Sequence, residues 1–143
     1  MAVASIGAKA IAADRSIIVL DASGSMWAQI DGKSRIEIAR DTLRTVLPTL
    51  PADEELGLMA YGHREKGSCD DIQLLVAPAR GTANAIQIVV DAINPKGKTP
   101  LSEAVKRAAE ELKYTEEKAT VILITDGLET CNADPCALAT ELE

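Results

Sequence analysis

The sequence contains no phenylalanine, and aromatic residues make up only 2% of it. The core must therefore be built from Ile, Val, Leu and Ala, which is the usual filling of a β-sheet covered by helices. Long apolar runs are also lacking, so no segment of the chain is expected to insert directly into a membrane. With 143 residues, the chain is long enough to bury the core of one domain.

Basic residues and histidine are scarce as well. Fifteen Lys and Arg residues stand against 22 Asp and Glu residues, and the formal net charge is −7. This balance argues against nucleic acid as a partner, because phosphate binding requires a basic stripe. The single histidine, His63, and the absence of a Cys-x-x-Cys pair argue against a zinc site.

The three cysteines, Cys69, Cys131 and Cys136, are an odd number. They fit either a reduced cytosolic set, or one disulfide and an orphan in an extracytoplasmic protein, periplasmic or secreted. We expect one bridge, and we favour Cys131–Cys136 over either link to Cys69. A loop that folds back into a helix at Pro135 can bring two Cα atoms within the ~4.4–6.8 Å that a disulfide allows.

Apolar periodicity divides the rest of the chain into strands and helices. Residues 1–13 lack a charged start and an uninterrupted apolar centre, so we interpret them as a disordered leader before a domain over 14–143. Continuous aliphatic runs predict buried strands at 16–21 and 120–126. Helical spacing is found at 36–50, 86–93 and 99–112, and Pro135 begins a last helix.

Two further strands are predicted at 56–61 and 72–76. The connection between them is too short for a crossover helix, so they should pair antiparallel. The fold class is therefore α/β, an open Rossmann-like sheet that is mainly parallel with one antiparallel edge hairpin and helices on both faces. The chain ends abruptly after the predicted last helix, and we interpret it as lacking the last strands of such a domain.

Five oxygen-bearing side chains are expected at one rim of this sheet. Asp21 and Asp126 end the two most hydrophobic strands, and ligands of open α/β sheets gather beyond the carboxyl ends of the strands. Ser23 and Ser25 follow directly after the first strand, and Thr99 begins a helix at the same edge. An oxygen-only set of this kind suits Mg²⁺, with Ca²⁺ or Mn²⁺ as substitutes.

Three of these five side chains are neutral hydroxyls. The protein would therefore leave part of the charge of the ion uncancelled and one coordination position to water. A Glu or Asp carboxylate of a protein partner can take that position. The chemistry favours capture of a partner, and we do not expect an enzyme.

Three short motifs of this sequence resemble those of a known protein family. Asp21-Ala22-Ser23-Gly24-Ser25 matches the D-x-S-x-S signature of the metal-ion-dependent adhesion site of von Willebrand factor A domains. Gly97-Lys98-Thr99-Pro100-Leu101 resembles the threonine loop of that family, and Ile124-Thr125-Asp126-Gly127 resembles its T-D-G strand end. The resemblance covers roughly residues 14–143, and the cysteine-bearing loops are similar to those of bacterial exported proteins, some of them chloride-channel-regulator-like.

The resemblance implies roles for the five residues. Ser23, Ser25 and Thr99 would contact the metal directly, whereas Asp21 and Asp126 often act through water in this family. It also implies a Rossmann-like fold and a protein partner. By this resemblance we expect the last strands and helix of the family to be absent from this sequence and the five metal ligands to be present.

Other interpretations of these residues remain open. Residues 92–99 satisfy a loose phosphate-binding loop for a nucleotide, although a helical segment precedes them and two prolines remove N–H donors. A metal-dependent hydrolase would use Ser23 with His63 as its base. Thr99 can simply be a helix N-cap. Trp27 is interpreted as an exposed anchor for a partner rather than a buried lid.

Overall fold

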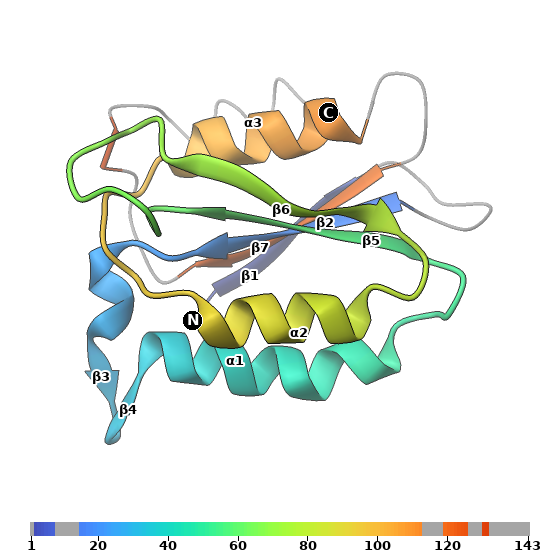
Figure 1. Cartoon of the computed structure of the whole chain (residues 1–143), viewed down its shortest axis with the longest axis horizontal. Coiled ribbons are helices and arrows are strands. Elements are labelled where there is room, and N and C mark those ends of the chain that lie inside the picture. Colours follow the sequence, from blue (N-terminus) through green and yellow to red (C-terminus); the bar gives the residue numbers. More distant parts are fainter. Residues whose placement is uncertain (1, 8–14, 113–118, 126–129, 132–143) are drawn as a thin grey trace.

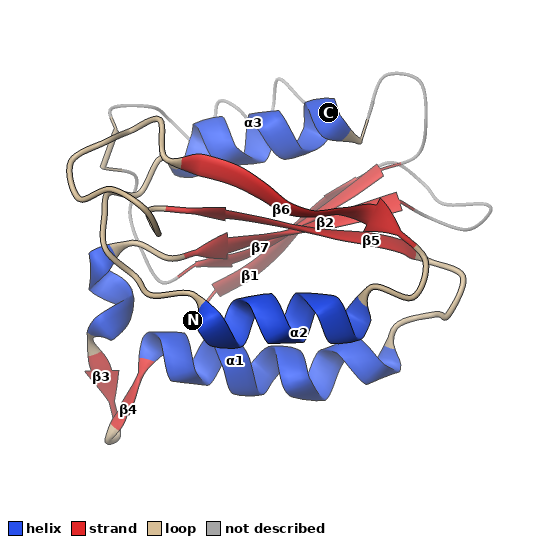
Figure 2. Cartoon of the chain, in the orientation of Figure 1, coloured by secondary structure: helices blue, strands red, loops and turns tan. Residues whose placement is uncertain are grey.

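The computed structural model describes residues 2–7, 15–112, 119–125 and 130–131. Its elements are β1 (Ala2–Gly7), β2 (Arg15–Asp21), η1 (Gly24–Trp27), β3 (Gln29–Ile30), β4 (Lys33–Ser34), α1 (Arg35–Val46), η2 (Leu47–Thr49), β5 (Glu55–Tyr61), β6 (Ile72–Ala79), α2 (Ala83–Ala92), α3 (Leu101–Glu111) and β7 (Ala119–Thr125). A five-stranded sheet in the order β1-β7-β2-β5-β6 lies between α1 and α2 on one face and α3 on the other (Figure 1, Figure 2).

The sheet is parallel at its centre and antiparallel at both edges. Strand β2 pairs parallel with β5 on one side and with β7 on the other, so Asp21 lies opposite Tyr61. Strands β5 and β6 pair antiparallel, which confirms the predicted edge hairpin. The Rossmann-like α/β class is therefore confirmed, and β2 carries its last residue to the middle of the rim.

The amino-terminal segment differs from the predicted disordered leader. Residues Ala2–Gly7 form β1, which pairs antiparallel with β7 in the register Ala4 to Leu123. This strand gives the sheet a second antiparallel edge. Its small residues carry no clear pattern in the sequence, and it forms by backbone pairing to an edge of β7 that only the folded sheet presents.

Helix α1 begins at a capping box. The Ser34 side chain accepts a hydrogen bond from the Glu37 backbone N–H at 3.3 Å, and the Glu37 side chain accepts one from the Ser34 N–H at 3.3 Å. This reciprocal capping box satisfies two N–H groups that have no partner inside the helix. The helix then buries Ile36, Ala39 and Leu43, and it ends before Pro48.

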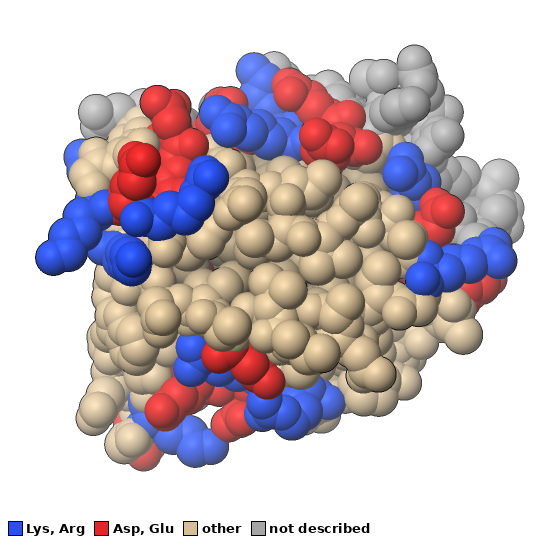
Figure 3. Space-filling view, in the orientation of Figure 1, with Lys and Arg blue, Asp and Glu red and all other residues tan. Residues whose placement is uncertain are grey.

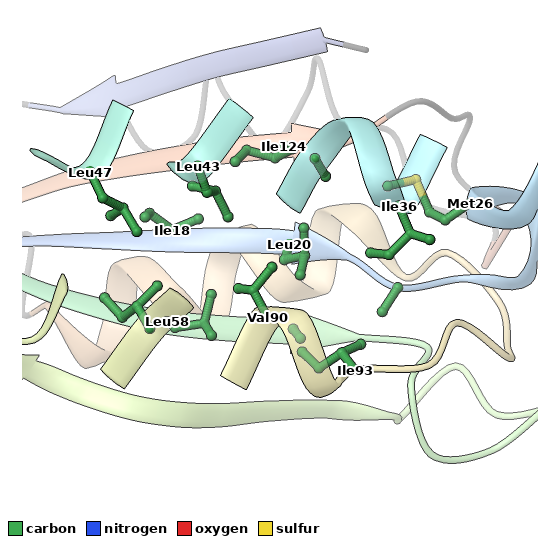
Figure 4. Close-up of a cluster of buried hydrophobic side chains, with 14 of the residues drawn as sticks. Ile18, Leu20, Met26, Ile36, Leu43, Leu47, Leu58, Val90, Ile93 and Ile124 are labelled. Atoms are coloured by element: carbon green, nitrogen blue, oxygen red, sulfur yellow. The ribbon is translucent and has the colours of Figure 1, made fainter. Parts of the chain in front are cut away.

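The core lies in two layers, one on each face of the sheet. Aliphatic side chains of β2 and β5 alternate between the layers, so Ile18 and Leu20 face α1 and α2 whereas Ile17 and Val19 face α3. Figure 4 shows the first layer, in which Leu43 and Val90 approach the strands from the two helices. Both layers are almost entirely aliphatic, as the lack of phenylalanine requires.

The predicted helices over 36–50, 86–93 and 99–112 correspond to α1, α2 and α3. The predicted last helix from Pro135 lies outside the described residues. Within the described part of the chain, no helix has the length and apolar character needed to cross a membrane.

Candidate metal centre at the carboxyl end of the sheet

Asp21 is the centre of the candidate site. Its side chain is buried, and its Oδ1 accepts hydrogen bonds from the Ser23 backbone N–H at 2.9 Å and from Ser23 Oγ at 2.6 Å. Ser23 Oγ lies 3.0 Å from Ser25 Oγ, which is carried by the single turn η1. The turn therefore folds the three predicted residues of this loop onto one point.

The second carboxylate oxygen of Asp21 is held from the neighbouring strand. Thr125, the last residue of β7, donates its Oγ1–H to Asp21 Oδ2 at 2.7 Å, and Tyr61 donates its hydroxyl to Thr125 Oγ1 at 3.2 Å. All three side chains are buried. Sequence analysis quoted Thr125 within a motif but gave it no role. Asp126 itself lies outside the described residues.

Thr99 reaches the same rim through its loop. The Gly24 backbone N–H donates to the Gly97 carbonyl at 2.9 Å, and this segment forms a parallel β-bridge from Ser23 to Gly97. Thr99 is buried, its backbone N–H donates to Thr130 Oγ1 at 2.7 Å, and its carbonyl accepts from the Thr130 N–H at 3.1 Å. Sequence analysis gave Thr130 no role, and nothing in its local pattern marks it.

The start of α3 differs slightly from the prediction. Thr99 is expected to begin this helix, but Pro100 occupies the N-cap position and Leu101 is the first helical residue. The interpretation of Thr99 as an ordinary N-cap is wrong for the same reason. Its position in the loop is set by the two hydrogen bonds to Thr130.

Two glycines allow the loops of the rim to touch. Gly62 has a positive φ of 75°, and an added Cβ would lie 2.6 Å from the Lys98 carbonyl oxygen. A Cβ on Gly97 would overlap the carbonyl oxygen of Glu65. The Gly97 N–H also donates to the Gly62 carbonyl at 2.7 Å. Any side chain at either position would push these loops apart.

The loop between β5 and β6 is organised by a buried carboxylate, Asp71. Its Oδ2 accepts from the backbone N–H groups of Arg64 at 2.6 Å and Glu65 at 2.8 Å, and its Oδ1 accepts from Arg64 Nε at 2.6 Å. Burial by itself raises the pKa of the Asp71 carboxyl, but the Arg64 guanidinium and the two backbone N–H groups outweigh it and lower the pKa below its ordinary value. Asp71 lies in the connection that the sequence predicts between the strands at 56–61 and 72–76, where no local pattern marks its role.

The disulfide corrects the favoured pairing. Cys69 is bonded to Cys131, with Cα atoms 5.8 Å apart, and not Cys131 to Cys136. The bridge joins the β5–β6 loop to the segment after β7, across a sequence separation of 62 residues. The short spacing of Cys131 and Cys136 suggested a local loop, whereas the sheet topology brings two distant loops together. Cys136 lies outside the described residues.

Trp27 and His63 flank the rim. Trp27 is 49% exposed, which confirms the exposed interpretation, and its Nε1–H donates to the Pro95 carbonyl at 2.8 Å. His63 Nε2 lies 2.8 Å from Gln73 Oε1. This contact ties the imidazole ring to β6.

The donor atoms at the rim fit a small hard cation. Mg²⁺ holds oxygens at about 2.0–2.1 Å in an octahedron, so neighbouring ligand oxygens are about 2.9 Å apart. Ser23 Oγ and Ser25 Oγ are 3.0 Å apart beside the Asp21 carboxylate. Among the described residues, no three His, Cys, Asp or Glu side chains gather as a metal site of that kind. A site here would therefore rest on hydroxyl oxygens as much as on carboxylates.

A model of the von Willebrand factor type A domain matches residues 16–129. The chain belongs to this family. The matched range includes the D-x-S-x-S turn, the threonine loop and the T-D-G strand end, which are the motifs that carry the candidate site. The expected family membership is therefore confirmed.

Relatives of this von Willebrand factor type A domain include two uncharacterized proteins of Bacillus subtilis (strain 168). YwmD is 30% identical over 135 residues, covering 87% of this chain and 60% of YwmD. YwmC is 29% identical over 135 residues, covering 88% of this chain and 60% of YwmC. The chain thus spans about three-fifths of the length of these relatives.

Two solved structures share the fold of the domain. BatB from Bacteroides thetaiotaomicron, a conserved hypothetical protein, superposes with a TM-score of 0.54 at 23% identity, covering 67% of this chain and 44% of BatB. The three N-terminal domains of the type V pili tip protein Mfa5 from Porphyromonas gingivalis give a TM-score of 0.58 at 18% identity, covering 94% of this chain and 28% of that chain. At such identities the likeness shows the fold.

Proposed function

We propose that this domain binds a divalent cation, Mg²⁺ or else Ca²⁺ or Mn²⁺, and uses it to capture a Glu or Asp carboxylate of a protein partner. The residues that would hold the ion are Asp21, Ser23, Ser25, Thr99 and Asp126. The observation that carries the proposal is the convergence of the Ser23 and Ser25 hydroxyls on the buried Asp21 carboxylate. Family membership supports it, since domains of this family commonly mediate metal-dependent protein interactions.

Neighbouring hydroxyl groups fix the orientation of the Asp21 carboxylate. Asp21 is held on one oxygen by Ser23 and on the other by Thr125, so its carboxylate cannot rotate freely. The hydroxyls of Ser23, Ser25 and Thr99 carry no charge to neutralise a cation. When bound, the ion would supply a positive centre, with a coordination position that these hydroxyls leave open, to which a carboxylate oxygen of the partner can bind.

We propose that the domain is not an enzyme. A serine nucleophile needs a base that accepts its proton. Ser23 Oγ donates instead to Asp21, so the proton of this hydroxyl is not directed at His63, whose Nε2 contacts Gln73. The described contacts therefore favour a binding site over a hydrolase built on Ser23 and His63.

The nucleotide alternative is disfavoured by the loop over 92–99. It leaves a helix, α2, instead of a strand, and the N–H groups of Lys96 and Gly97 donate to carbonyls of Ala22 and Gly62. The Thr99 N–H donates to Thr130. A phosphate-binding loop needs such N–H groups directed at the ligand.

We also propose an extracytoplasmic compartment, periplasmic or secreted. The Cys69–Cys131 bridge supports it, because disulfides of this structural kind persist in oxidising compartments. Thiol counting on protein isolated without reductant tests this directly. Three free thiols would contradict it.

Calorimetric titration with Mg²⁺ tests the metal site. We expect Ser23→Ala and Asp21→Asn to weaken Mg²⁺ binding at least tenfold, or about 1.4 kcal/mol, with the circular dichroism of the folded protein retained. Ser16→Ala is the matched control, since Ser16 is buried at the opposite end of β2. Unchanged Mg²⁺ affinity in folded Ser23→Ala would refute the assignment.

Two companion assays address the alternatives. ATP titration of the wild type and Lys98→Ala would reveal tight, Lys98-dependent binding if the loop held phosphate. Generic ester and phosphate substrates should show no metal-dependent turnover. Activity that disappears in both Ser23→Ala and His63→Ala would overturn the non-enzymatic assignment.

A further inference from the structure

A shallow apolar depression of about 390 Å³ lies beside the candidate metal centre. Its apolar wall is the carboxyl-terminal half of α2, with Ile88, Val89 and Ala92. His63 and Lys96 line it from the loops of the rim. Ile88 is 70% exposed, more than any other large hydrophobic side chain in the part of the chain that the structure describes.

The depression and the metal centre share a wall. The Lys96 backbone N–H donates to the Ala22 carbonyl at 3.1 Å and to the Gly62 carbonyl at 3.0 Å. Ala22 lies between Asp21 and Ser23, so one hydrogen bond separates the lining of the depression from the metal loop. An extended peptide advances about 3.3 Å per residue. The lining of the depression is thus next to the metal loop, and three residues of an extended peptide span about 10 Å.

The charged side chain in the lining of the depression, Lys96, is basic, which favours an acidic segment over a basic one. The protein as a whole carries a net charge of −7, yet the loop over 94–99 contains Lys96 and Lys98, both exposed, and no acidic residue. Figure 3 shows that charged side chains surround a broad uncharged area over β6 and α2 on this face. The apolar wall of the depression belongs to α2, whereas its lysine belongs to the rim.

We propose that this depression is a second anchor for the partner, which accepts an aliphatic side chain within about three residues of the carboxylate that the metal holds. The inference rests on the proposed function and adds the chemistry that selects among acidic partners. A carboxylate alone would bind weakly at the metal. The aliphatic contact with Ile88, Val89 and Ala92 makes an acidic and aliphatic segment bind more tightly than an acidic polar one.

The test uses labelled seven-residue peptides that have Glu at the centre and Ser or Gly at the other six positions. In a series of variants, a single Leu replaces each of these six residues in turn. Fluorescence anisotropy in Mg²⁺ measures their binding to the whole chain. We expect at least one Leu position to bind about five- to tenfold more tightly than the Leu-free peptide, since an open depression buries part of a Leu side chain. Replacing Glu with Gln, or Mg²⁺ with EDTA, should abolish binding.

Three variants locate the effect. Ala92→Gln fills the depression and Ile88→Ser removes its apolar wall, and both positions are exposed, so the fold should be kept. Ala85→Gln is the matched control, because Ala85 is exposed on the same helix two turns away and does not line the depression. The Leu gain should disappear in the first two variants and persist in the third, with Mg²⁺ affinity unchanged in all three.

The outcomes separate the two proposals. Glu-dependent and Mg²⁺-dependent binding without a Leu gain, or with a gain that survives both Ala92→Gln and Ile88→Ser, overturns the second anchor and keeps the metal centre. A Leu gain that persists in EDTA and in Ser23→Ala overturns the coupling to the metal. No Mg²⁺-dependent binding of any peptide overturns both proposals.

Discussion

Asp71 offers a strong test of how the rim is held together. It is the buried carboxylate of the β5–β6 loop, and it binds two backbone N–H groups and the Arg64 guanidinium. The same loop contains Gly62, whose carbonyl accepts from Lys96 and Gly97. Loss of the Asp71 contacts should therefore lower the free energy of unfolding and loosen the rim.

The magnitude follows from the contacts that each substitution removes. In Asp71→Asn the amide oxygen can still accept from both backbone N–H groups, but the amide NH₂ faces the Arg64 Nε–H. One charge-assisted hydrogen bond is lost, and we expect a cost of about 1.5 kcal/mol, the low end of its range because Arg64 is half exposed. Asp71→Ala also leaves two N–H groups without their acceptor, so we expect a loss of about 3–4 kcal/mol.

The pH dependence has a definite sign. The folded-state pKa of Asp71 is lowered. The Asp71 carboxylate therefore contributes fully to the free energy of unfolding above its unfolded pKa of about 3.9, and this contribution is lost as the pH falls through the folded pKa. The difference in stability between the wild type and Asp71→Asn should therefore be full at pH 7. It should shrink below about pH 4.

Urea unfolding followed by circular dichroism at pH 7 and at pH 3.5 measures both effects. Asp70→Asn is the control, because Asp70 is the exposed neighbour of Asp71, and it should change stability by less than about 0.5 kcal/mol. An Asp71→Ala protein as stable as the Asp70→Asn control would refute the reasoning. So would a difference between the wild type and Asp71→Asn that grows as the pH is lowered.

Three further perturbations test other parts of the structure. The double variant Cys69→Ser, Cys131→Ser opens a loop of 62 residues, so its free energy of unfolding in urea should fall by up to about 4 kcal/mol through loop entropy. The reduced wild type should lose the same amount of stability. Gly97→Ala should lower the free energy of unfolding by about 1–3 kcal/mol, because the added Cβ overlaps the neighbouring loop, and it should weaken Mg²⁺ binding in calorimetry. A Gly97→Ala protein with wild-type Mg²⁺ affinity would contradict the claim that this contact positions the metal site. Ser34→Ala removes the cap of α1 and should lower the free energy of unfolding by about 1 kcal/mol, which is measured as a lower thermal midpoint. Its Mg²⁺ affinity should be unchanged.

Local pattern was enough to predict the frame of this domain. The aliphatic runs that end at Asp21 and Thr125 are short and rich in β-branched residues, which predicts strands buried on both faces. The helical spacing of Ile86 and Val90 outweighs their β-branched character. Because parallel strands carry their carboxyl ends to one edge, the sequence also predicted that the residues after them would meet. The structure places these residues at the same rim of the sheet, namely Asp21, Ser23, Ser25 and Thr99.

What the sequence alone did not determine are the contacts between segments far apart in the chain. The pairing of Cys69 with Cys131 and the contact between Thr99 and Thr130 depend on which loops the sheet brings together. Strand β1 depends on an edge of β7 that exists only after folding. Local periodicity reports whether a segment is helix or strand, but such contacts are selected by the free energy of the whole assembled structure, which no single segment encodes.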